Sequence, residues 1–252
     1  NVSTFTGFAA DAAAAAAQRL VNLSTRTTAG TDDRVAIAGF VITGLESKIV
    51  LIRAVGPTLR SFGVTAPLAA PRLELMRGGT PTPIATNTGW TTAANSAELT
   101  AAASNAGAFS FTAGSADSAL LATLAPGSYT AVVSAADGRA GIGLVEVYDL
   151  SGDTKPQRLA NLSTRALAGT GDDTLIAGVV VSGTVPKRIL IRAAGPALAP
   201  FGVSGVLTRP QLTLFNGGTV IATNAGWSTS LDRDAITEAA ARTGAFAFPA
   251  TS

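Results

Sequence analysis

The chain has 252 residues, of which 47% are hydrophobic and only 13% are charged. That hydrophobic content is enough for a core in each of two ordinary domains, whereas the charged fraction is about half of the ~25% usual in soluble domains. The 18 Lys and Arg exceed the 16 Asp and Glu by only two, and the basic residues are scattered along the chain, which argues against a nucleic-acid-binding patch and a basic membrane anchor. No apolar run reaches the ~18 residues that would predict membrane insertion.

The chain contains neither Cys nor His. The lack of Cys excludes disulfide scaffolds, thiol catalysis and thiolate metal sites. The lack of His excludes Ser-His-Asp hydrolysis and His-zinc hydrolysis by residues of this chain. These exclusions favour a non-enzymatic protein.

The sequence contains two copies of one repeat. Residues 19–26 (RLVNLSTR) recur as residues 158–165 (RLANLSTR), an offset of 158 − 19 = 139. A two-residue deletion in the Pro-rich stretch 80–83 changes the offset to 137, which brings Trp90 onto Trp227. An indel in a Pro-rich segment is what a surface turn tolerates.

Each copy is rich in short β-branched or alternating segments separated by turn residues, a pattern typical of strands. A hairpin is expected where Gly78-Gly79 follows the alternating segment 72–76, and again in the second copy after 211–215. The strands predicted in the first copy are 35–42, 49–53, 72–76, 118–124, 128–134 and 141–148.

One helical insertion is expected in each copy. Residues 230–244 have polar N-cap candidates, acidic residues in the first turn and Gly244 at the end. Residues 95–107 form a weaker counterpart in the first copy.

About eight antiparallel strands in a repeat of this length predict a two-sheet sandwich. The expected fold class is therefore all-β, with two tandem antiparallel β-sandwich units of Ig-like or jelly-roll-like type and a short helix in each. The expected divisions are an N-terminal segment (1–18), a complete repeat (19–150), a linker (151–157) and an incomplete repeat (158–252).

The second copy has no counterpart of residues 117–150, so about three strands are missing from it. One explanation is that the chain is part of a longer one, and the other is that another copy supplies the strands in a head-to-tail polymer. Residues 1–18 could be a linker, a processed terminus or a donor strand for a neighbour. The residues expected to take part in assembly are Val2, Phe5, Phe8, Phe246 and Phe248.

Few charged side chains recur between the copies. Of the first copy's carboxylates only Asp33 recurs, as Asp172, which argues against a catalytic carboxylate pair. Arg53 lies in an apolar strand, where a charge requires a partner or a wet face, and it recurs as Arg192. Ion pairs of Arg53 with Asp33 and of Arg192 with Asp172 are therefore expected, and recognition of a phosphate or carboxylate is the alternative.

Two further kinds of ligand site are possible. Trp90 and Trp227 each follow an Asn-x-Gly motif and could stack on sugars, although Trp more often packs in a core or an interface. The acidic loops at 31–33, 171–173 and 149–153 could hold calcium, but two carboxylates in a loop are few for that ion. No other metal or cofactor is expected.

The run 117–134 (DSALLATLAPGSYTAVVS) followed by 141–148 (GIGLVEVY) resembles the closing strands of the bacterial pre-peptidase C-terminal type of β-sandwich. Together with the Asn-Leu-Ser-Thr-Arg opening and the Arg-Ala-x-Gly-Pro segment, residues 19–252 resemble a tandem repeat of large secreted bacterial surface proteins. The resemblance implies an extracellular location and a structural or binding role, and it carries no catalytic motif.

The expected function is therefore that of a building block of an extracellular filament, stalk or adhesin on the bacterial cell surface. Its partners would be other copies of itself or neighbouring repeats. The alternative is a carbohydrate-binding module of a secreted enzyme, with a polysaccharide as the partner.

Overall fold

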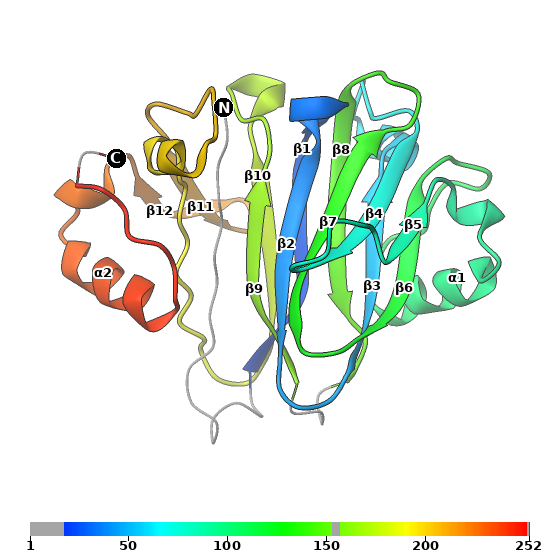
Figure 1. Cartoon of the computed structure of the whole chain (residues 1–252), viewed down its shortest axis with the longest axis horizontal. Coiled ribbons are helices and arrows are strands. Elements are labelled where there is room, and N and C mark those ends of the chain that lie inside the picture. Colours follow the sequence, from blue (N-terminus) through cyan, green and yellow to red (C-terminus); the bar gives the residue numbers. More distant parts are fainter. Residues whose placement is uncertain (1–17, 153–156, 251) are drawn as a thin grey trace.

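The computed structural model describes residues 18–152, 157–250 and 252. These residues form twelve β-strands, two α-helices and six short 3-10 helices, so the expected all-β character is confirmed (Figure 1). Strand pairing between the named strands is antiparallel throughout.

The first copy of the repeat contributes eight strands. They are β1 (Gln18–Ala29), β2 (Ala36–Thr43), β3 (Lys48–Val55), β4 (Pro71–Arg77), β5 (Ala85–Asn87), β6 (Ser118–Leu124), β7 (Gly127–Ala135) and β8 (Gly141–Asp149). Its helices are α1 (Ser96–Asn105), η1 (Asp32–Arg34), η2 (Pro57–Phe62) and η3 (Trp90–Thr92).

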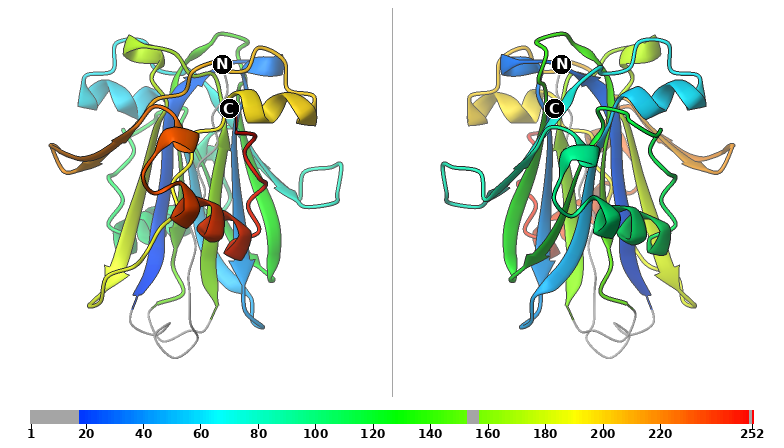
Figure 2. Two further views of the ribbon diagram at one scale, coloured as in Figure 1. Left: turned by 90° about the vertical axis from the view of Figure 1, so that its left-hand side faces the viewer. Right: turned by 90° about the vertical axis from the view of Figure 1, so that its right-hand side faces the viewer.

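The second copy contributes four strands among the described residues. They are β9 (Arg158–Arg165), β10 (Ile176–Gly183), β11 (Leu212–Asn216) and β12 (Thr219–Asn224). Its helices are α2 (Arg233–Arg242), η4 (Gly171–Asp173), η5 (Pro196–Phe201) and η6 (Trp227–Thr229). Both α-helices lie within the ranges predicted from the sequence, and they occupy opposite sides of the molecule (Figure 2).

The strands follow the alternating pattern of the sequence. Along β2, buried and partly exposed side chains alternate, because successive side chains of a strand point to opposite faces. The predicted hairpins form as β4–β5 and β11–β12. In the first of them, Gly79 adopts a φ of 82°, a backbone conformation that L side chains rarely adopt.

The large sheet consists of two parts joined at one residue pair. Half-sheet A has the order β5-β4-β7-β2-β9, and half-sheet B has the order β10-β1-β8-β3-β6. The join is the pairing of Leu20 with Leu159, between β1 and β9. Although only η1 and its flanking residues separate β1 from β2 in sequence, these two strands belong to different half-sheets.

One hydrophobic core lies between the two half-sheets. Half-sheet A contributes Phe40 and Leu162, and half-sheet B contributes Leu23, Ile52 and Val147, all of them nearly inaccessible to solvent. A second, smaller cluster lies on the outer face of β3, β6 and β8, where α1 covers it. Each half-sheet therefore buries its inner face, and α1 also covers part of the outer face of half-sheet B.

The two copies of the repeat meet edge to edge, through pairing of β1 with β10 and of β2 with β9. We call these two pairings the junction. Ser24 pairs with Gly178 and Gly39 pairs with Ser163, and the repeat offset of 139 converts one pair into the other. The hydroxyls of the equivalent residues Thr25 and Thr164 hydrogen-bond to each other at 2.7 Å. An approximate two-fold axis therefore passes through the junction.

The segment 187–194 repeats the sequence of β3 but is not a strand. In the first copy, β3 is paired on one side by β6 and on the other by β8. The described part of the second copy contains no counterpart of β6 or β8, so no described strand pairs with the backbone of 187–194. For the same reason β11 and β12 form a separate two-stranded sheet, because β4 joins the large sheet through β7.

Glycine is required at two equivalent positions of the junction because the strands approach closely there. A Cβ atom at Gly39 would lie 2.6 Å from the hydroxyl oxygen of Ser163, and a Cβ at Gly178 would lie 2.6 Å from that of Ser24. Such a distance forces the serine side chain or the backbone to move. The recurrence of this glycine in both copies therefore follows from the junction.

We expect Gly39→Ala to lower the free energy of unfolding by about 1–2 kcal/mol through steric overlap with Ser163. Ser163→Ala removes the overlapping hydroxyl, so the double variant should recover most of this loss. Gly218→Ala is the control, because a Cβ there meets no atom within 4 Å. Urea denaturation of the four proteins of the cycle measures the coupling, and strictly additive effects of the two substitutions would contradict this account.

Candidate assembly site

A buried charged cluster lies on the outer face of half-sheet B, centred on Arg53 of β3. Arg53 is only 1% exposed, and its guanidinium lies 3.5 Å from a carboxylate oxygen of Glu146 on the neighbouring strand β8. The hydroxyl of Tyr148 donates a hydrogen bond of 2.8 Å to the same carboxylate. The rings of Phe109 and Phe111 lie 4.4 and 4.3 Å from the guanidinium carbon and cover it by cation–π contact.

The charges of this cluster depend on one another because the surrounding protein excludes water. Burial raises the pKa of the Glu146 carboxyl, an effect opposed by the Arg53 charge and by the Tyr148 hydrogen bond. Burial likewise lowers the pKa of Arg53, and Glu146 opposes it. Each charge is therefore tolerated in the interior mainly because the other is present.

Asp149, at the end of β8, neutralises two buried cations of the first copy. One of its carboxylate oxygens lies 2.7 Å from the guanidinium of Arg19 and 2.7 Å from the ammonium of Lys48. Arg19 also donates to the carbonyl of Gly152. Strand β8 thus supplies both acidic groups, Glu146 and Asp149, that balance the cations of its neighbours β1 and β3.

The second copy repeats the cation and the aromatic rings but not the carboxylate. Arg192, the counterpart of Arg53, is 6% exposed, and the rings of Phe246 and Phe248 lie 4.6 and 3.7 Å from its guanidinium carbon. Its two terminal nitrogens have no hydrogen-bond partner among the described residues. Burial alone lowers its pKa to about 10, so the group remains charged at neutral pH.

A second pair of cations accompanies Arg192. Lys187 is the counterpart of Lys48, and Arg158 is the counterpart of Arg19. The pKa of Lys187 is lowered by burial and by the positive charge of Arg158. The positive charges of Arg19 and Arg158 also oppose the charge of Lys48, so these cations of the two copies lie near one another.

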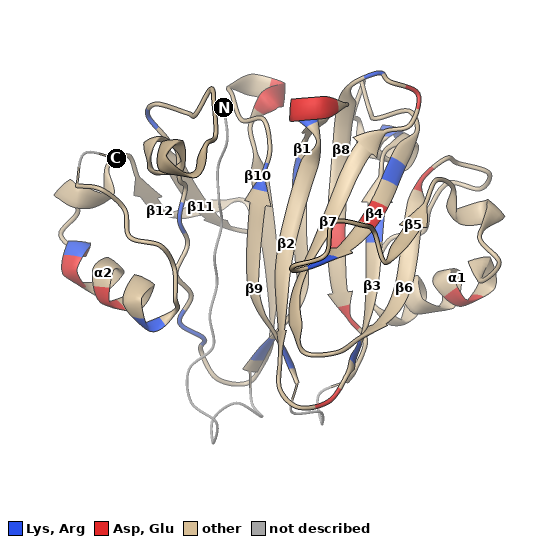
Figure 3. Ribbon diagram, viewed as in Figure 1, with Lys and Arg blue, Asp and Glu red and all other residues tan. Residues whose placement is uncertain are grey.

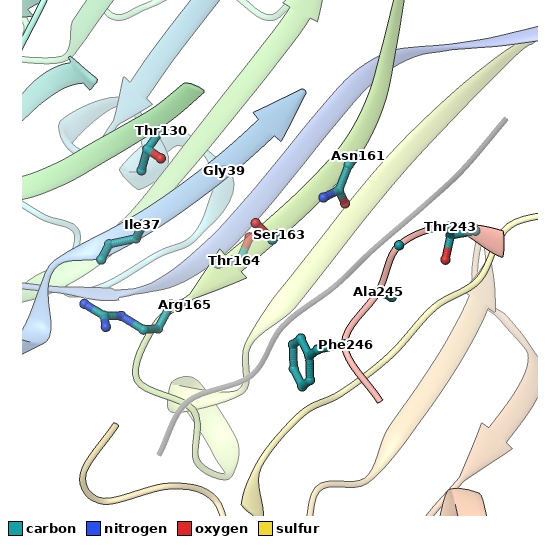
Figure 4. A pocket seen from close by; sticks show the side chains of 11 residues that line it. Ile37, Gly39, Thr130, Asn161, Ser163, Thr164, Arg165, Thr243, Ala245 and Phe246 are labelled. Atoms are coloured by element: carbon teal, nitrogen blue, oxygen red, sulfur yellow. The ribbon is translucent and has the colours of Figure 1, made fainter. Parts of the chain in front are cut away.

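Two cavities flank the aromatic residues that hold Arg192. A cavity of about 350 Å³ lies beside the junction, lined by Asn161, Ser163 and Arg165 of β9 and by residues 243–246 (Figure 4). A cavity of about 410 Å³ lies between residues 191–196 and the segment 222–227. Phe246 lines the first cavity and Phe248 lines the second.

The prediction that Asp33 and Asp172 are the acidic partners of the two buried arginines is wrong. Asp33 lies in η1 and Asp172 in η4, both exposed in the loops that follow β1 and β9. Arg53 pairs with Glu146 instead, because antiparallel pairing places these two residues opposite each other on β3 and β8. Arg192 has no ion pair with Asp172.

The two tryptophans occupy equivalent packed positions. Trp90 contacts Phe111, with ring centroids 5.5 Å apart, and its indole N–H donates to Ser115. Trp227 contacts Phe248 at 6.0 Å and donates to Ser252. Both rings are half-buried, and Trp227 lines the 410 Å³ cavity. These contacts do not test sugar stacking by the two rings, which stays a prediction.

Of the residues expected to take part in assembly, Val2, Phe5 and Phe8 lie outside the described residues. Phe246 and Phe248 cover Arg192, as described above. Sequence reasoning missed Glu146, Tyr148, Asp149 and Lys48. The signal that could have found two of them is the Glu-x-Tyr-Asp sequence at 146–149, which places acidic groups at the end of an otherwise apolar strand.

The part of the chain that the structure describes contains no cluster of three or more acidic, His or Cys residues able to hold a metal ion. The residues of the acidic loops considered for calcium lie within the described part except Asp153. Neither of the two α-helices in the described ranges has the length and apolar character needed to cross a membrane.

Comparisons with known proteins give no relative. No protein-family model, curated protein or solved structure shows a significant match to this chain.

We expect Glu146→Leu to lower the free energy of unfolding by about 3–5 kcal/mol, because Arg53 would remain buried without its carboxylate. The double variant Arg53→Met/Glu146→Leu should recover most of this loss, since no charge is then left in the interior. Chemical denaturation of the single and double variants measures both effects. A double variant that is less stable than Glu146→Leu would show that the cation–π contacts, not the ion pair, dominate.

Proposed function

We propose that this protein is a non-enzymatic structural protein, built from β-sandwich repeats that join one another along their strand edges. The observation that carries the proposal is the junction, in which two copies of one repeat are joined by continuous backbone pairing on both half-sheets. Such a contact uses only strand edges and is repeatable from one repeat to the next.

The far sides of β9 and β10 are suited to continue this pairing. Within the described residues, β9 pairs with β2 and, at one residue, β1, while β10 pairs with β1 alone. In the first copy the equivalent strands β1 and β2 are each paired along both sides. Ile176 and Val180 of β10 are 47% and 50% exposed, and exposed apolar edge strands favour association.

The low charge of the chain supports the same role. Charged side chains are sparse over the sheet (Figure 3). A surface with little charge does not oppose packing against neighbouring copies or repeats, whereas strong net charge keeps proteins apart. Together with the resemblance of residues 19–252 to repeats of secreted surface proteins, this favours an extracellular filament, stalk or adhesin of the bacterial cell surface.

Self-association of the purified protein tests the proposal. Sedimentation and negative-stain microscopy over a micromolar-to-millimolar range should show a mass that rises with concentration, with elongated particles. Lysine on an edge strand opposes edge pairing, so Ile176→Lys/Val180→Lys should shift the association midpoint at least about tenfold.

The control for added charge is Ile84→Lys/Leu231→Lys, which places two lysines at exposed apolar positions outside β9 and β10. This variant should associate as the parent does. A parent chain that stays dispersed and monomeric at every concentration would contradict self-assembly.

A further inference from the structure

The second copy contains a buried cation without its anion. In the first copy, Glu146 of β8 balances Arg53. In the second, Arg192 keeps the burial and the two covering rings, but no carboxylate of the described residues forms an ion pair with it. An uncompensated buried charge is costly, and the cost is removed when a carboxylate binds.

The positions around Arg192 indicate which kind of segment would bring that carboxylate. Lys187 and Arg158 occupy the places of Lys48 and Arg19, which share Asp149 in the first copy. A strand that carries Glu and, three residues later, Asp would therefore meet two positive sites at the spacing that β8 has with its own neighbours.

The 410 Å³ cavity lies where the start of β6 lies in the first copy. In that copy Ser118, at the start of β6, donates to the carbonyl of Pro71, and the N–H of Ala119 donates to the side chain of Asn87. Their counterparts in the second copy, Pro210 and Asn224, both line the 410 Å³ cavity. The 350 Å³ cavity extends from β9 across Ile37 and Gly39 of β2 to Thr130 of β7, so it lies over half-sheet A. The side of β9 away from β2 corresponds to the side of β1 that pairs with β8 in the first copy.

The approximate two-fold axis fixes the register of an incoming strand. In the first copy Glu146 lies opposite Ser24 on β1 and opposite Arg53 on β3. The repeat offset of 139 converts these residues into Ser163 and Arg192. A bound strand of the β8 type would therefore place its Glu between Ser163 and Arg192.

We propose that the second copy is a binding site for a β-strand with the pattern Glu-x-Tyr-Asp, presented by a neighbouring repeat of the same type. The strand inserts between β9 and the segment 187–194, pairs with both backbones, and brings its Glu to Arg192 and its Asp to Lys187. The inference rests on the proposed function, because it names the partner through which the array of repeats is extended.

Binding would also supply main-chain partners to the segment 187–194. This segment resembles β3 in sequence, and among the described residues no strand pairs with it. Addition of a strand on its β9 side supplies the main-chain hydrogen bonds that β8 supplies to β3, while the carboxylates supply specificity. Charge-assisted hydrogen bonds of this kind are about twice as strong as neutral ones.

A fluorescein-labelled peptide with the sequence of residues 141–151 tests the proposal on the full chain. Fluorescence anisotropy should show saturable binding. A peptide with the equivalent of Glu146→Gln should bind roughly 10- to 100-fold more weakly. Hydrogen exchange should show new protection at 158–165 and 187–194, and none at the equivalent segments of the first copy, which β8 already covers.

The matched protein variants are Arg192→Met and Arg188→Met, which remove one positive charge from the same segment. Arg188 is exposed, so its variant should bind the peptide as the parent does. Arg192→Met should weaken binding, and in that background the Glu and Gln peptides should bind equally well. Equal binding of the two peptides to the parent, or protection elsewhere, would overturn the proposal.

The outcome is separable from that of the self-association experiment. If the chain stays monomeric but binds the peptide at Arg192, the strand-binding site is supported and assembly of the chain with itself is contradicted. If the chain associates but does not bind the peptide, association through strand edges is supported and the strand-binding site is contradicted. Protection of 187–194 that rises with the concentration of the chain alone, without peptide, would support the strand site and identify the neighbouring repeat as one of a second copy.

Discussion

The need of every β-strand for a hydrogen-bonded neighbour governs this structure. The segments 48–55 and 187–194 have nearly the same apolar sequence, yet only the first is a strand. Their local preferences are alike, so the difference comes from the neighbours: β6 and β8 flank the first segment, and the described residues contain no equivalent for the second. Here strand formation is a property of pairing and not of the segment alone.

The same constraint explains why the two copies meet as they do. Strands β1 and β2 follow each other in sequence but lie in different half-sheets, and each would have an unpaired side without the second copy. The junction pairs both at once, with β10 on β1 and β9 on β2. Gly39 and Gly178 allow the close approach, and the Thr25–Thr164 hydrogen bond joins the copies near the axis.

Much of the fold could be predicted from the sequence because local patterns specify it. Alternation, turn residues and helix-end residues predicted six strands of the first copy, both hairpins and both α-helices close to where they lie, whereas β1 was not among the strands predicted. The junction could not be predicted, since it depends on contacts more than 100 residues apart along the chain. The irregular conformation of 187–194 was missed, because comparing the two copies assumes that segments of similar sequence have the same secondary structure.

The candidate site illustrates a limit of comparing two copies of a repeat. That comparison retained Arg53 with Arg192 and rejected nearly every carboxylate, so it favoured the one acid that recurs, Asp33, as a partner. The actual partner, Glu146, lies in the part of the first copy for which the second has no counterpart. A rule based on recurrence cannot find a residue whose equivalent lies outside the aligned segments.

The recurrence of the arginine without its acid is therefore informative in itself. A buried arginine between two aromatic rings lowers the stability of the folded state, because desolvation of its charge opposes folding unless an anion is near. In the second copy the arginine, its two rings and the flanking lysine recur at the positions equivalent to those beside β8 in the first. In the proposed complex, one strand brings both the anion and the main-chain partners. The same binding event would therefore neutralise Arg192 and supply hydrogen bonds to the backbone of 187–194.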